Sequence, residues 1–563
     1  MSITIFDDGC VYHPELITGL EETKDWCLVR GQIFSSEALD PLVKVIADPK
    51  ILNFSESDAS IISYKSRDGL VLIRDNCGAT PLYFAKSGVS WIASFDLKSL
   101  FERLGKVPPP REDTLYDFLA THYRYVFRIP ERTFHEGVYQ VPAGHVVRIS
   151  GDSFKIEPWL ELSFDPLACS LTRQEAADHY LNSLRKNVVD RLEKLKGKFN
   201  FTISSGLDSS TVAALASEYL KEPIECWYTA YSSAKGTPYD ETEGVKALVT
   251  AKGWKLNSLE LHAPDLLNET FALMEKTLSP SITVTWLSNY ILAKKARERG
   301  VEYLFSGLGG DESLAGEFEH FFLFFADLYS SGQTELLERE TQAWIQLHDH
   351  PVFKKSHAVR DAYFSRNIDF NTMEIRVDRE RYSQNLGYFS PDWVKAMEDA
   401  LPPPPMPTPY PFFLSNRLYQ EMSYETSPPT LWSEALSSKA GGVKEIFPMA
   451  SPKLFRLALS VPGTYKYQDG LTKMLLRRST KELLPDVTRL NPVKTGFNAP
   501  LDLWLKDRQV AKSVLELLED SKLSKTGWLL KDSPKRIVTE HLEGTHNHMM
   551  LLWPLISTAI FLK

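Results

Sequence analysis

The sequence predicts two domains, a β-rich layered domain followed by a doubly wound parallel α/β domain with a helical C-terminal part. Three observations lead to this prediction. The chain of 563 residues is too long for a single hydrophobic core. Short segments that alternate in polarity dominate the first part of the chain. From residue 170 onward, strand-like and helix-like segments alternate, as they do around parallel sheets. We therefore place the domains at residues 1–165 and 170–563.

The composition argues against several classes of protein. Apolar residues make up 43% and charged residues 24% of the chain, which is typical of ordinary soluble proteins. The net charge of −9 provides no sequence-wide basic field, so we expect no nucleic-acid partner. The longest apolar run, 549–562, is too short to cross a bilayer and contains Pro554, so we expect a buried closing helix and no membrane partner. The start MSITIFDDGC lacks a signal-peptide pattern, and the five cysteines form no C-x-x-C pair, which predicts a cytoplasmic protein with reduced thiols.

The elements of the first domain are expected to be short strands separated by turns. The alternating segments lie at residues 60–64, 69–74, 81–84 and 89–93. Polar residues that follow the Asp165-Pro166 pair break the strand pattern and predict a hinge over 167–176. A helix over 175–195 should then lead into the second domain, because its apolar residues recur at helical spacing.

Residues 198–220 predict a strand, a Ser/Gly-rich turn and a helix in succession. Phe199, Phe201 and Ile203 alternate with polar residues, and apolar side chains recur at helical spacing from Val212. Backbone N–H groups at the start of such a helix have no intrahelical partner, so the turn predicts an anion site. A hydroxyl-rich helix cap with a first-turn carboxylate is the alternative. The predicted binding residues are Ser204, Ser205, Gly206, Asp208, Ser209 and Ser210.

A second turn of the same kind, SGLGGDE at 306–312, follows a strand expected at 301–305. Gly307 and Gly309 let the main chain pass close to a nucleotide, so they join the predicted binding residues. Asp311 leaves the end of its strand as Asp208 does. Two carboxylates that converge on one pyrophosphate suit Mg²⁺, which prefers hard oxygen ligands shared with phosphates. We therefore predict Asp208 and Asp311 as metal ligands.

Several segments resemble motifs of one enzyme family. The first turn resembles the S-G-G-x-D-S pyrophosphate loop of N-type ATP pyrophosphatases, with Ser205 in place of a glycine, and the second resembles S-G-x-G-x-D-E. DGLTKMLLRR at 469–478 and KTGFNAPLDLWL at 494–505 resemble two later motifs. In the first domain, RDNCGATPLY at 74–83 and TFHEGVYQVPAGH at 133–145 resemble a glutaminase domain. Together these segments resemble the asparagine synthetase superfamily, which includes β-lactam and carbapenam synthetases and lasso-peptide cyclases.

This resemblance implies a fold and an activity. The first domain would be the αββα sandwich of N-terminal-nucleophile hydrolases, and the second a pyrophosphatase-loop domain. The implied reaction uses ATP and Mg²⁺ to turn a carboxylate into an acyl-adenylate, from which an amine displaces AMP. Lys494 would stabilise the developing charge, as preorganised positive charge does. A solvent-facing loop lysine is the alternative for Lys494.

Departures from the family motifs refine the expected function of the first domain. Glutamine-hydrolysing members begin with a cysteine that acts as nucleophile, whereas position 2 here is Ser2. The segment that would clasp glutamine is not recognisable around 25–36. We therefore expect an inactive glutaminase-like domain that is retained for structure or for shaping the second site. A Ser2-dependent amidotransferase is the alternative.

A second departure concerns the general base. Leu308 stands where family members carry a glutamate or a tyrosine, and Lys444 takes the place of a partner glutamate. Glu445, one position further, becomes the candidate catalytic base. The alternatives are that the base is lost, that Glu312 or His320 serves instead, and that Glu445 is only a surface carboxylate.

The leading prediction is an AMP-forming ligase that closes a lactam or macrolactam in natural-product biosynthesis. Its partners would be a small molecule or peptide that carries a carboxylate and an amine, and homodimerisation is left open. Alternatives are the joining of two separate small molecules, an amidotransferase that uses ammonia or glutamine, and a catalytically degenerate binding partner.

Overall fold

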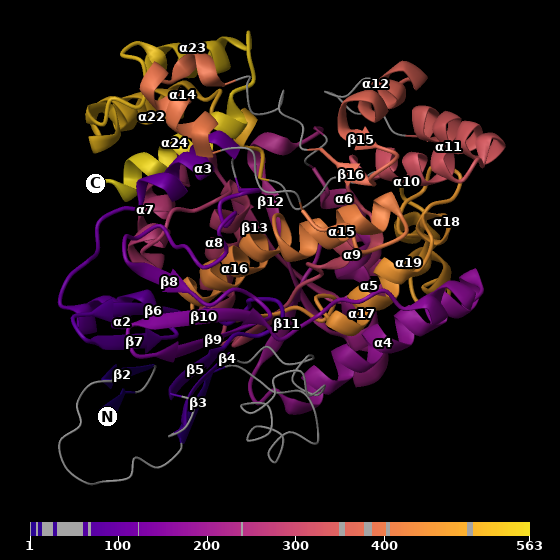
Figure 1. Ribbon diagram of the computed structural model, residues 1–563. Helices are drawn as coiled ribbons and strands as arrows, with labels where there is room; N and C mark the ends of the chain where they lie inside the picture. The colour runs from indigo at the N-terminus through magenta and orange to yellow at the C-terminus, as the bar shows by residue number, and fades with distance from the viewer. Residues whose placement is uncertain are drawn as a thin grey trace.

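The computed structural model describes residues 2–6, 9–13, 26–30, 60–65, 69–121, 123–237, 240–347, 355–376, 385–400, 406–492 and 499–563. Its architecture is mixed α/β (Figure 1), with paired antiparallel sheets in the N-terminal part and a parallel sheet flanked by helices in the remainder. None of the helices within these ranges is both long and apolar enough to cross a membrane.

The N-terminal part contains two five-stranded antiparallel sheets that pack face to face. Residues of both sheets, among them Leu72 and Phe84, share one buried cluster. Helix α2 (Leu97–Leu104) covers the outer face of the first sheet. The first sheet has the order β1 (Ser2–Phe6), β2 (Gly9–His13), β7 (Ser90–Ser94), β6 (Tyr83–Ser87) and β8 (Val138–Gln140). The second has the order β10 (Ser153–Pro158), β9 (His145–Ser150), β5 (Gly69–Ile73), β4 (Ser60–Lys65) and β3 (Trp26–Arg30).

Four strands predicted for this domain are confirmed, although one begins later than expected. The strand predicted at 81–84 begins at Tyr83. The preceding turn is held by the carboxylate of Asp75, which accepts hydrogen bonds from the backbone N–H groups of Cys77, Ala79 and Thr80. Because these hydrogen bonds hold the backbone in a turn, the strand begins two residues later than predicted.

The sheet of the second domain is parallel throughout, as the alternation of strands and helices predicts. Its order is β13 (Lys255–Leu261), β12 (Glu225–Tyr231), β11 (Phe199–Thr202), β14 (Tyr303–Phe305) and β17 (Lys444–Ile446). The chain runs outward from β11 to β13 and then returns to the other side of β11 with β14. The strand order therefore reverses between β11 and β14, which is where ligands bind in sheets of this kind.

Helices cover both faces of the parallel sheet. One face carries α4 (Arg173–Lys194), α5 (Leu207–Leu220), α6 (Thr242–Lys252), α17 (Pro452–Ser460) and α19 (Met474–Ser479). The other carries α8 (Val284–Glu298). Helix α5 begins at Leu207, five residues before the apolar periodicity that starts at Val212, because the residues between them are polar and carry no apolar signal.

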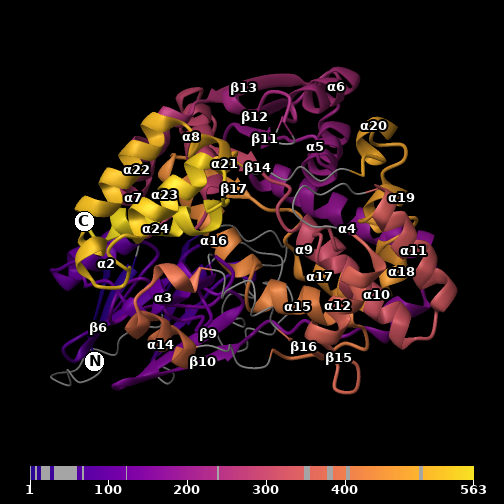
Figure 2. The same ribbon diagram turned by 90° about the horizontal axis from the view of Figure 1, so that it is seen from above.

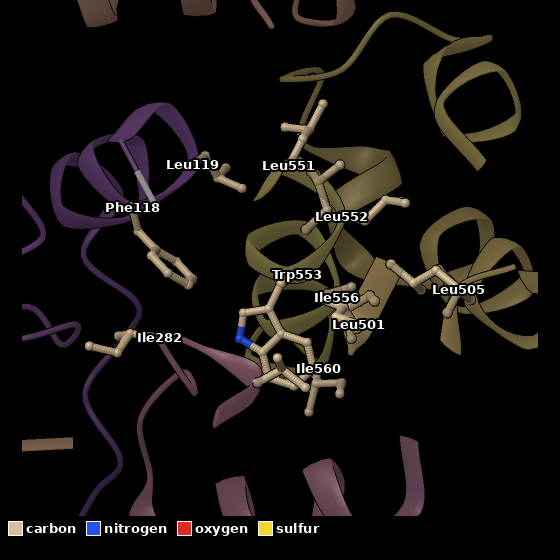
Figure 3. Packing of buried hydrophobic residues seen from close by; sticks show 14 of the residues in the cluster. Phe118, Leu119, Ile282, Leu501, Leu505, Leu551, Leu552, Trp553, Ile556 and Ile560 are labelled. Atoms are coloured by element: carbon tan, nitrogen blue, oxygen red, sulfur yellow. The ribbon is translucent and has the colours of Figure 1, made fainter. Parts of the chain in front are cut away.

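The predicted closing helix is confirmed as α24 (Met549–Phe561), which includes Pro554 and is largely buried. Figure 3 shows its apolar side chains packed against Leu501, Leu505 and, from the N-terminal part, Phe118. The indole N–H of Trp553 donates to the carbonyl of Ser281 at 2.8 Å. This core joins the C-terminal helices to the first domain.

Most of the remaining helices form two groups that lie on opposite sides of the molecule (Figure 2). One group comprises α3 (Glu112–Thr121), α7 (Leu266–Thr277), α14 (Pro391–Ala400), α21 (Leu501–Trp504), α22 (Arg508–Asp520) and α23 (Ser533–Glu543). The other comprises α10 (His320–Ser330), α11 (Thr334–Leu347), α12 (His357–Asn367) and α18 (Gly463–Lys466), with the ladder β15 (Ile368–Asp369) and β16 (Glu374–Ile375). Further helices are α2 (Leu97–Leu104), α9 (Gly310–Leu314), α15 (Phe413–Ser423), α16 (Ser427–Ala440) and α20 (Asp486–Arg489).

Candidate functional site

The first predicted loop connects β11 to α5 and is held by its own hydroxyl groups. Gly206 caps the helix without a side-chain hydrogen bond, so the hydroxyl cap of the alternative is not formed, although its first-turn carboxylate, Asp208, is present. The hydroxyls of Ser204 and Ser209 lie 3.0 Å apart. The Ser205 hydroxyl donates to Oε1 of Glu241 at 2.7 Å. These bonds hold the loop at the start of α5, where first-turn N–H groups have no intrahelical partner, so its geometry suits an anion.

The second loop, between β14 and α9, packs directly on the first. A Cβ added at Gly307 would lie 2.8 Å from Cα of Ser209, and one at Gly310 would lie 2.6 Å from Oδ1 of Asp208. Only glycine permits these approaches, to the backbone of Ser209 at Gly307 and to the carboxylate of Asp208 at Gly310. Gly309 has a φ of +101° at the start of α9. The contact between the loops places Asp208 and Asp311 in the first turns of neighbouring helices.

Lys473 joins these two aspartates. Its ammonium nitrogen contacts Oδ2 of Asp208 and lies 2.6 Å from Oδ1 of Asp311. The lysine is buried and adopts a left-handed backbone conformation, with a φ of +57°, directly before α19. A Cβ at Gly316 would lie 2.5 Å from Cε of Lys473, so the lysine side chain fills the space beside that glycine. The two predicted metal ligands therefore meet at the reversal point of the sheet.

The donor set fits Mg²⁺ and the phosphates of ATP. Two carboxylate oxygens that contact one nitrogen are close enough to share one cation, and Mg²⁺ prefers such oxygens together with phosphates. The glycine contacts bring backbone close to the start of α5, as a phosphate cradle requires. Asp208 and Asp311 are thus the residues that could hold the metal.

The sequence alone does not show that Lys473 is the lysine that contacts both aspartates. Lys473 belongs to the DGLTK segment that resembles a family motif, but its contact partner Asp208 lies 265 residues away in the sequence. The motif was the only signal that could have identified it. Lys494, the lysine predicted for catalysis, lies outside the residues that the structure describes.

Glu445, the predicted base, lies on β17 and forms part of a buried carboxyl pair. Its side chain is buried and accepts a hydrogen bond from Ser438, so the alternative of a surface carboxylate is wrong. Glu434 on α16 interacts with it from the neighbouring helix. Burial raises the pKa of Glu445 to about 7. Burial and the charge of Glu445 raise the pKa of Glu434 well above its usual range.

Glu434 reaches the second loop through Ser306. The Ser306 hydroxyl donates to Oε1 of Glu434 at 2.7 Å, and it accepts the backbone N–H of Leu308 at 3.2 Å. A carboxyl group therefore stands beside the loop in which Leu308 replaces an ionisable residue. Glu434 carries no motif signal, because its place depends on a contact with a residue 128 positions away.

His320, one of the alternative bases, is held in another buried network. Its Nε2 lies 2.7 Å from Oε2 of Glu421, and its Nδ1 accepts the backbone N–H of Glu317 at 3.2 Å. Arg417 pairs with the same glutamate at 2.9 Å. With both ring nitrogens engaged in this network, His320 is a poorer candidate for a base than the carboxyl pair.

The N-terminal domain contacts the elements that carry the site. The Cys77 thiol donates to the carbonyl of Ala450 at 2.7 Å, and a Cβ at Gly309 would lie 2.9 Å from the backbone nitrogen of the same alanine. The indole of Trp432 on α16 donates to the hydroxyl of Tyr83 at 3.1 Å. Ser2 begins β1, but its side chain lies outside the described set.

Comparison with known proteins agrees with this architecture. A family model described as asparagine synthase matches residues 179–563, and one described as a glutamine amidotransferase domain matches residues 59–160. The asparagine synthetase [glutamine-hydrolyzing] 1 of Bacillus subtilis (strain 168) is 21% identical over 96% of this chain and 86% of its own length. Amidase chry2 of Gibberella zeae is 20% identical over 61% of this chain and 52% of its own length, so the match spans about half of that relative.

A solved structure shows a weaker likeness. The glutamine phosphoribosylpyrophosphate amidotransferase of B. subtilis, complexed with ADP and GMP, is 9% identical over 52% of this chain and 64% of its own. Its TM-score of 0.16 is too low to support a shared fold. The family matches are therefore the informative ones. Since the larger of them covers well over half of the sequence, this chain belongs to the asparagine synthase family and carries an N-terminal domain of glutamine amidotransferase type.

Proposed function

We propose that this protein is an ATP-dependent ligase that activates a substrate carboxylate as an acyl-adenylate and joins it to an amine. The observation that carries this proposal is the convergence of Asp208 and Asp311 on one ammonium group, at the reversal point of a parallel sheet. Membership of the asparagine synthase family supports the reaction class.

The proposed reaction has two steps. A carboxylate oxygen of the substrate attacks the α-phosphorus of ATP, the bond to the β-phosphate breaks, and pyrophosphate leaves. An amine nitrogen then attacks the acyl carbon, the bond to AMP breaks, and AMP leaves with the bonding electrons. Mg²⁺, when bound, neutralises charge on the pyrophosphate. The loop Ser204–Ser210 would bind the phosphates, and Lys494 would stabilise the developing charge as the family resemblance implies.

The buried carboxyl pair is our candidate for accepting the amine proton. A base whose pKa lies near the working pH is effective, and the pKa of Glu445 is raised to about 7. Glu434 reaches the second loop through Ser306, whereas Glu445 lies on β17 and interacts with Glu434. Glu434 would therefore take the amine proton while it passes its own proton to Glu445, so that the pair acts as one base.

The amine would come from the substrate itself. Ser2 replaces the nucleophilic cysteine of glutamine-hydrolysing relatives, so a supply of ammonia from glutamine is not favoured. Closure of a lactam or macrolactam is therefore the leading version, and joining two small molecules is the next. The match of residues 59–160 to a glutamine amidotransferase domain favours one second candidate, a Ser2-dependent amidotransferase.

Measurements of pyrophosphate release and of the amide products distinguish these proposed reactions. The full chain is incubated with Mg²⁺-ATP and a panel of carboxylic acids, amino acids and linear peptides, and AMP and amide products are identified by mass spectrometry. We expect pyrophosphate release only with certain acids and its loss in Asp208→Asn. Glutamate release from glutamine that is abolished by Ser2→Ala would favour the amidotransferase. ATP binding without either reaction would favour a degenerate binding partner and contradict the ligase.

A further inference from the structure

The turn between α23 and α24 gathers three side chains of metal-binding type, far along the chain from the nucleotide loops. The donor atoms of Glu540, His546 and His548 all lie within 4.8 Å of one another. His546 is exposed, Glu540 is partly exposed, and His548 is buried, so the cluster can be reached from solvent on one side.

Backbone hydrogen bonds fix the turn that brings these donors together. Gly544 ends α23 with a φ of +75°. The N–H of His546 then donates to the carbonyl of Glu540 at 3.2 Å. The N–H of His548 donates to Nδ1 of His541 at 3.0 Å. These bonds therefore hold the two histidines close to Glu540. The conformational entropy of bringing the donors together is lost when the chain folds, before any metal binds.

Neighbouring side chains orient the carboxylate of Glu540. Its Oε1 accepts from the guanidinium of Arg536 at 2.8 Å, while its Oε2 accepts from the hydroxyl of Tyr388 at 2.5 Å. Nε2 of His548 lies 2.7 Å from the same Oε2. Hydrogen bonds from Tyr388, Arg536 and His548 therefore hold both oxygens of this carboxylate in place. Such outer contacts commonly orient metal ligands.

We propose that Glu540, His546 and His548 form a Zn²⁺ site. Two imidazoles and one carboxylate are a donor set that zinc accepts, with a fourth position left for water. Tetrahedral zinc places its donors about 3.4 Å apart, given bond lengths of about 2.1 Å. The separations of 2.7 Å between His548 and Glu540 and at most 4.8 Å across the cluster bracket that value. Small rotations of the exposed His546 side chain would complete the site, and the shared proton of His548 and Glu540 would be released.

A bound metal ion would hold Tyr388 and the short 3₁₀ helix η5 (Leu386–Tyr388) against α23, α24 and the turn between these helices. The competing interpretation is a plain hydrogen-bonded network in which Arg536 supplies all the positive charge. His357 on α12 provides a matched control for the histidines of the cluster. Its Nε2 lies 2.7 Å from Oε1 of Glu338, and in the described chain no third metal-type donor is grouped around this pair.

Zinc titration of the full chain, freed of any polyhistidine tag and stripped with a chelator, tests the proposal. Competition with a chromophoric chelator should give one Zn²⁺ per chain, and Co²⁺ should give the absorption of a tetrahedral site. His546→Ala, which changes an exposed residue, should weaken binding at least about tenfold. His357→Ala should leave it unchanged. Circular dichroism in chelator checks that the variants fold alike.

Two results would overturn the proposal. One is the absence of a stoichiometric Zn²⁺ site in the folded wild-type chain. The other is an affinity that His546→Ala leaves unchanged but Asp208→Asn abolishes, which would place the bound zinc at the nucleotide loops. Neither result would bear on pyrophosphate release, so the ligase proposal is tested separately.

Discussion

The ammonium nitrogen of Lys473 lies 2.6 Å from Oδ1 of Asp311, and the same group contacts Asp208. Two carboxylates at such short range repel each other unless a cation compensates them. The compensation is stronger here than at a surface, because the lysine is buried. Lys473 is therefore part of the charge balance of the proposed metal site.

Replacing Lys473 with methionine should lower stability in buffer without Mg²⁺. The variant leaves two neighbouring carboxylates uncompensated, at a cost of about 1–3 kcal/mol. Added Mg²⁺ should restore more stability to the variant than to the wild type, because a divalent cation can take over the lost charge. Urea unfolding with and without MgCl₂ measures this, with the exposed Lys481→Met as control. Equal gains from Mg²⁺ in Lys473→Met and wild type would contradict the assignment.

Asp208→Asn and Asp311→Asn should each reduce pyrophosphate formation by about 100-fold or more, a loss comparable to that of one transition-state contact. If both aspartates hold one ion, the double variant should lose little more than either single variant, because residues that act as a unit are not additive. Single-turnover assays at saturating ATP measure the losses. Asp178→Asn, exposed on α4, should behave as wild type. Losses that multiply in the double variant would argue for separate roles.

Gly307→Ala should weaken ATP binding, because the added Cβ would lie 2.8 Å from Cα of Ser209 and force the two loops apart. We expect a rise in the ATP KM of about tenfold and a measurable loss of stability, in line with overpacking costs of about 1–3 kcal/mol. Gly387→Ala is the matched control, since a Cβ there meets nothing within 4 Å. Comparable KM values for the two variants would show that the loop contact is unimportant.

The two loops could be predicted from the sequence because their signals are local. A strand, a glycine-rich turn and an aspartate at the start of a helix lie within a few residues of one another at Asp208 and again at Asp311. Their closeness in space then follows from the parallel sheet, whose strands β11 and β14 are neighbours. Local pattern and topology together therefore suffice for this half of the site.

The rest of the site depends on contacts that no local pattern encodes. In the sequence, Glu434 has no feature that distinguishes it from other helix residues, because its role depends on the packing of α16 beside Ser306. Lys473 lies within a motif, but the direction of its side chain depends on a left-handed backbone conformation. Its place in a motif predicts Glu445 as a base, whereas its burial depends on β17 and on the helix that packs against this strand.

The carboxyl pair should make stability depend on pH. The pKa of Glu445 is raised from an ordinary 4.5 to about 7, so the folded protein binds more protons than the unfolded chain between these values. Its contribution is therefore fully present below pH 4.5 and is lost as the pH rises towards 7. Each unit of pKa shift corresponds to about 1.4 kcal/mol.

Glu445→Gln removes this titration and should flatten the fall in unfolding free energy between pH 4.5 and 7. Urea midpoints across that range measure the effect, and the exposed Glu482→Gln should retain the wild-type slope. If Glu434 accepts the amine proton, Glu434→Gln should also slow amide formation while pyrophosphate release in the first step persists. Parallel pH profiles for wild type and Glu445→Gln would refute the assignment of the raised pKa.

Tyr83→Phe should show whether the N-terminal domain shapes the ligase site. The substitution removes the acceptor for the buried indole N–H of Trp432, at a cost of about 1–3 kcal/mol, and so loosens α16. Because α16 carries Glu434 and neither nucleotide loop, kcat for amide formation should fall several-fold while the KM for ATP stays constant. Tyr329→Phe, at an exposed position on α10, is the control. A rise in the ATP KM with unchanged kcat would mean that the domain contact acts on the loops, through Cys77 and Ala450, and not on the helix that bears the proposed base.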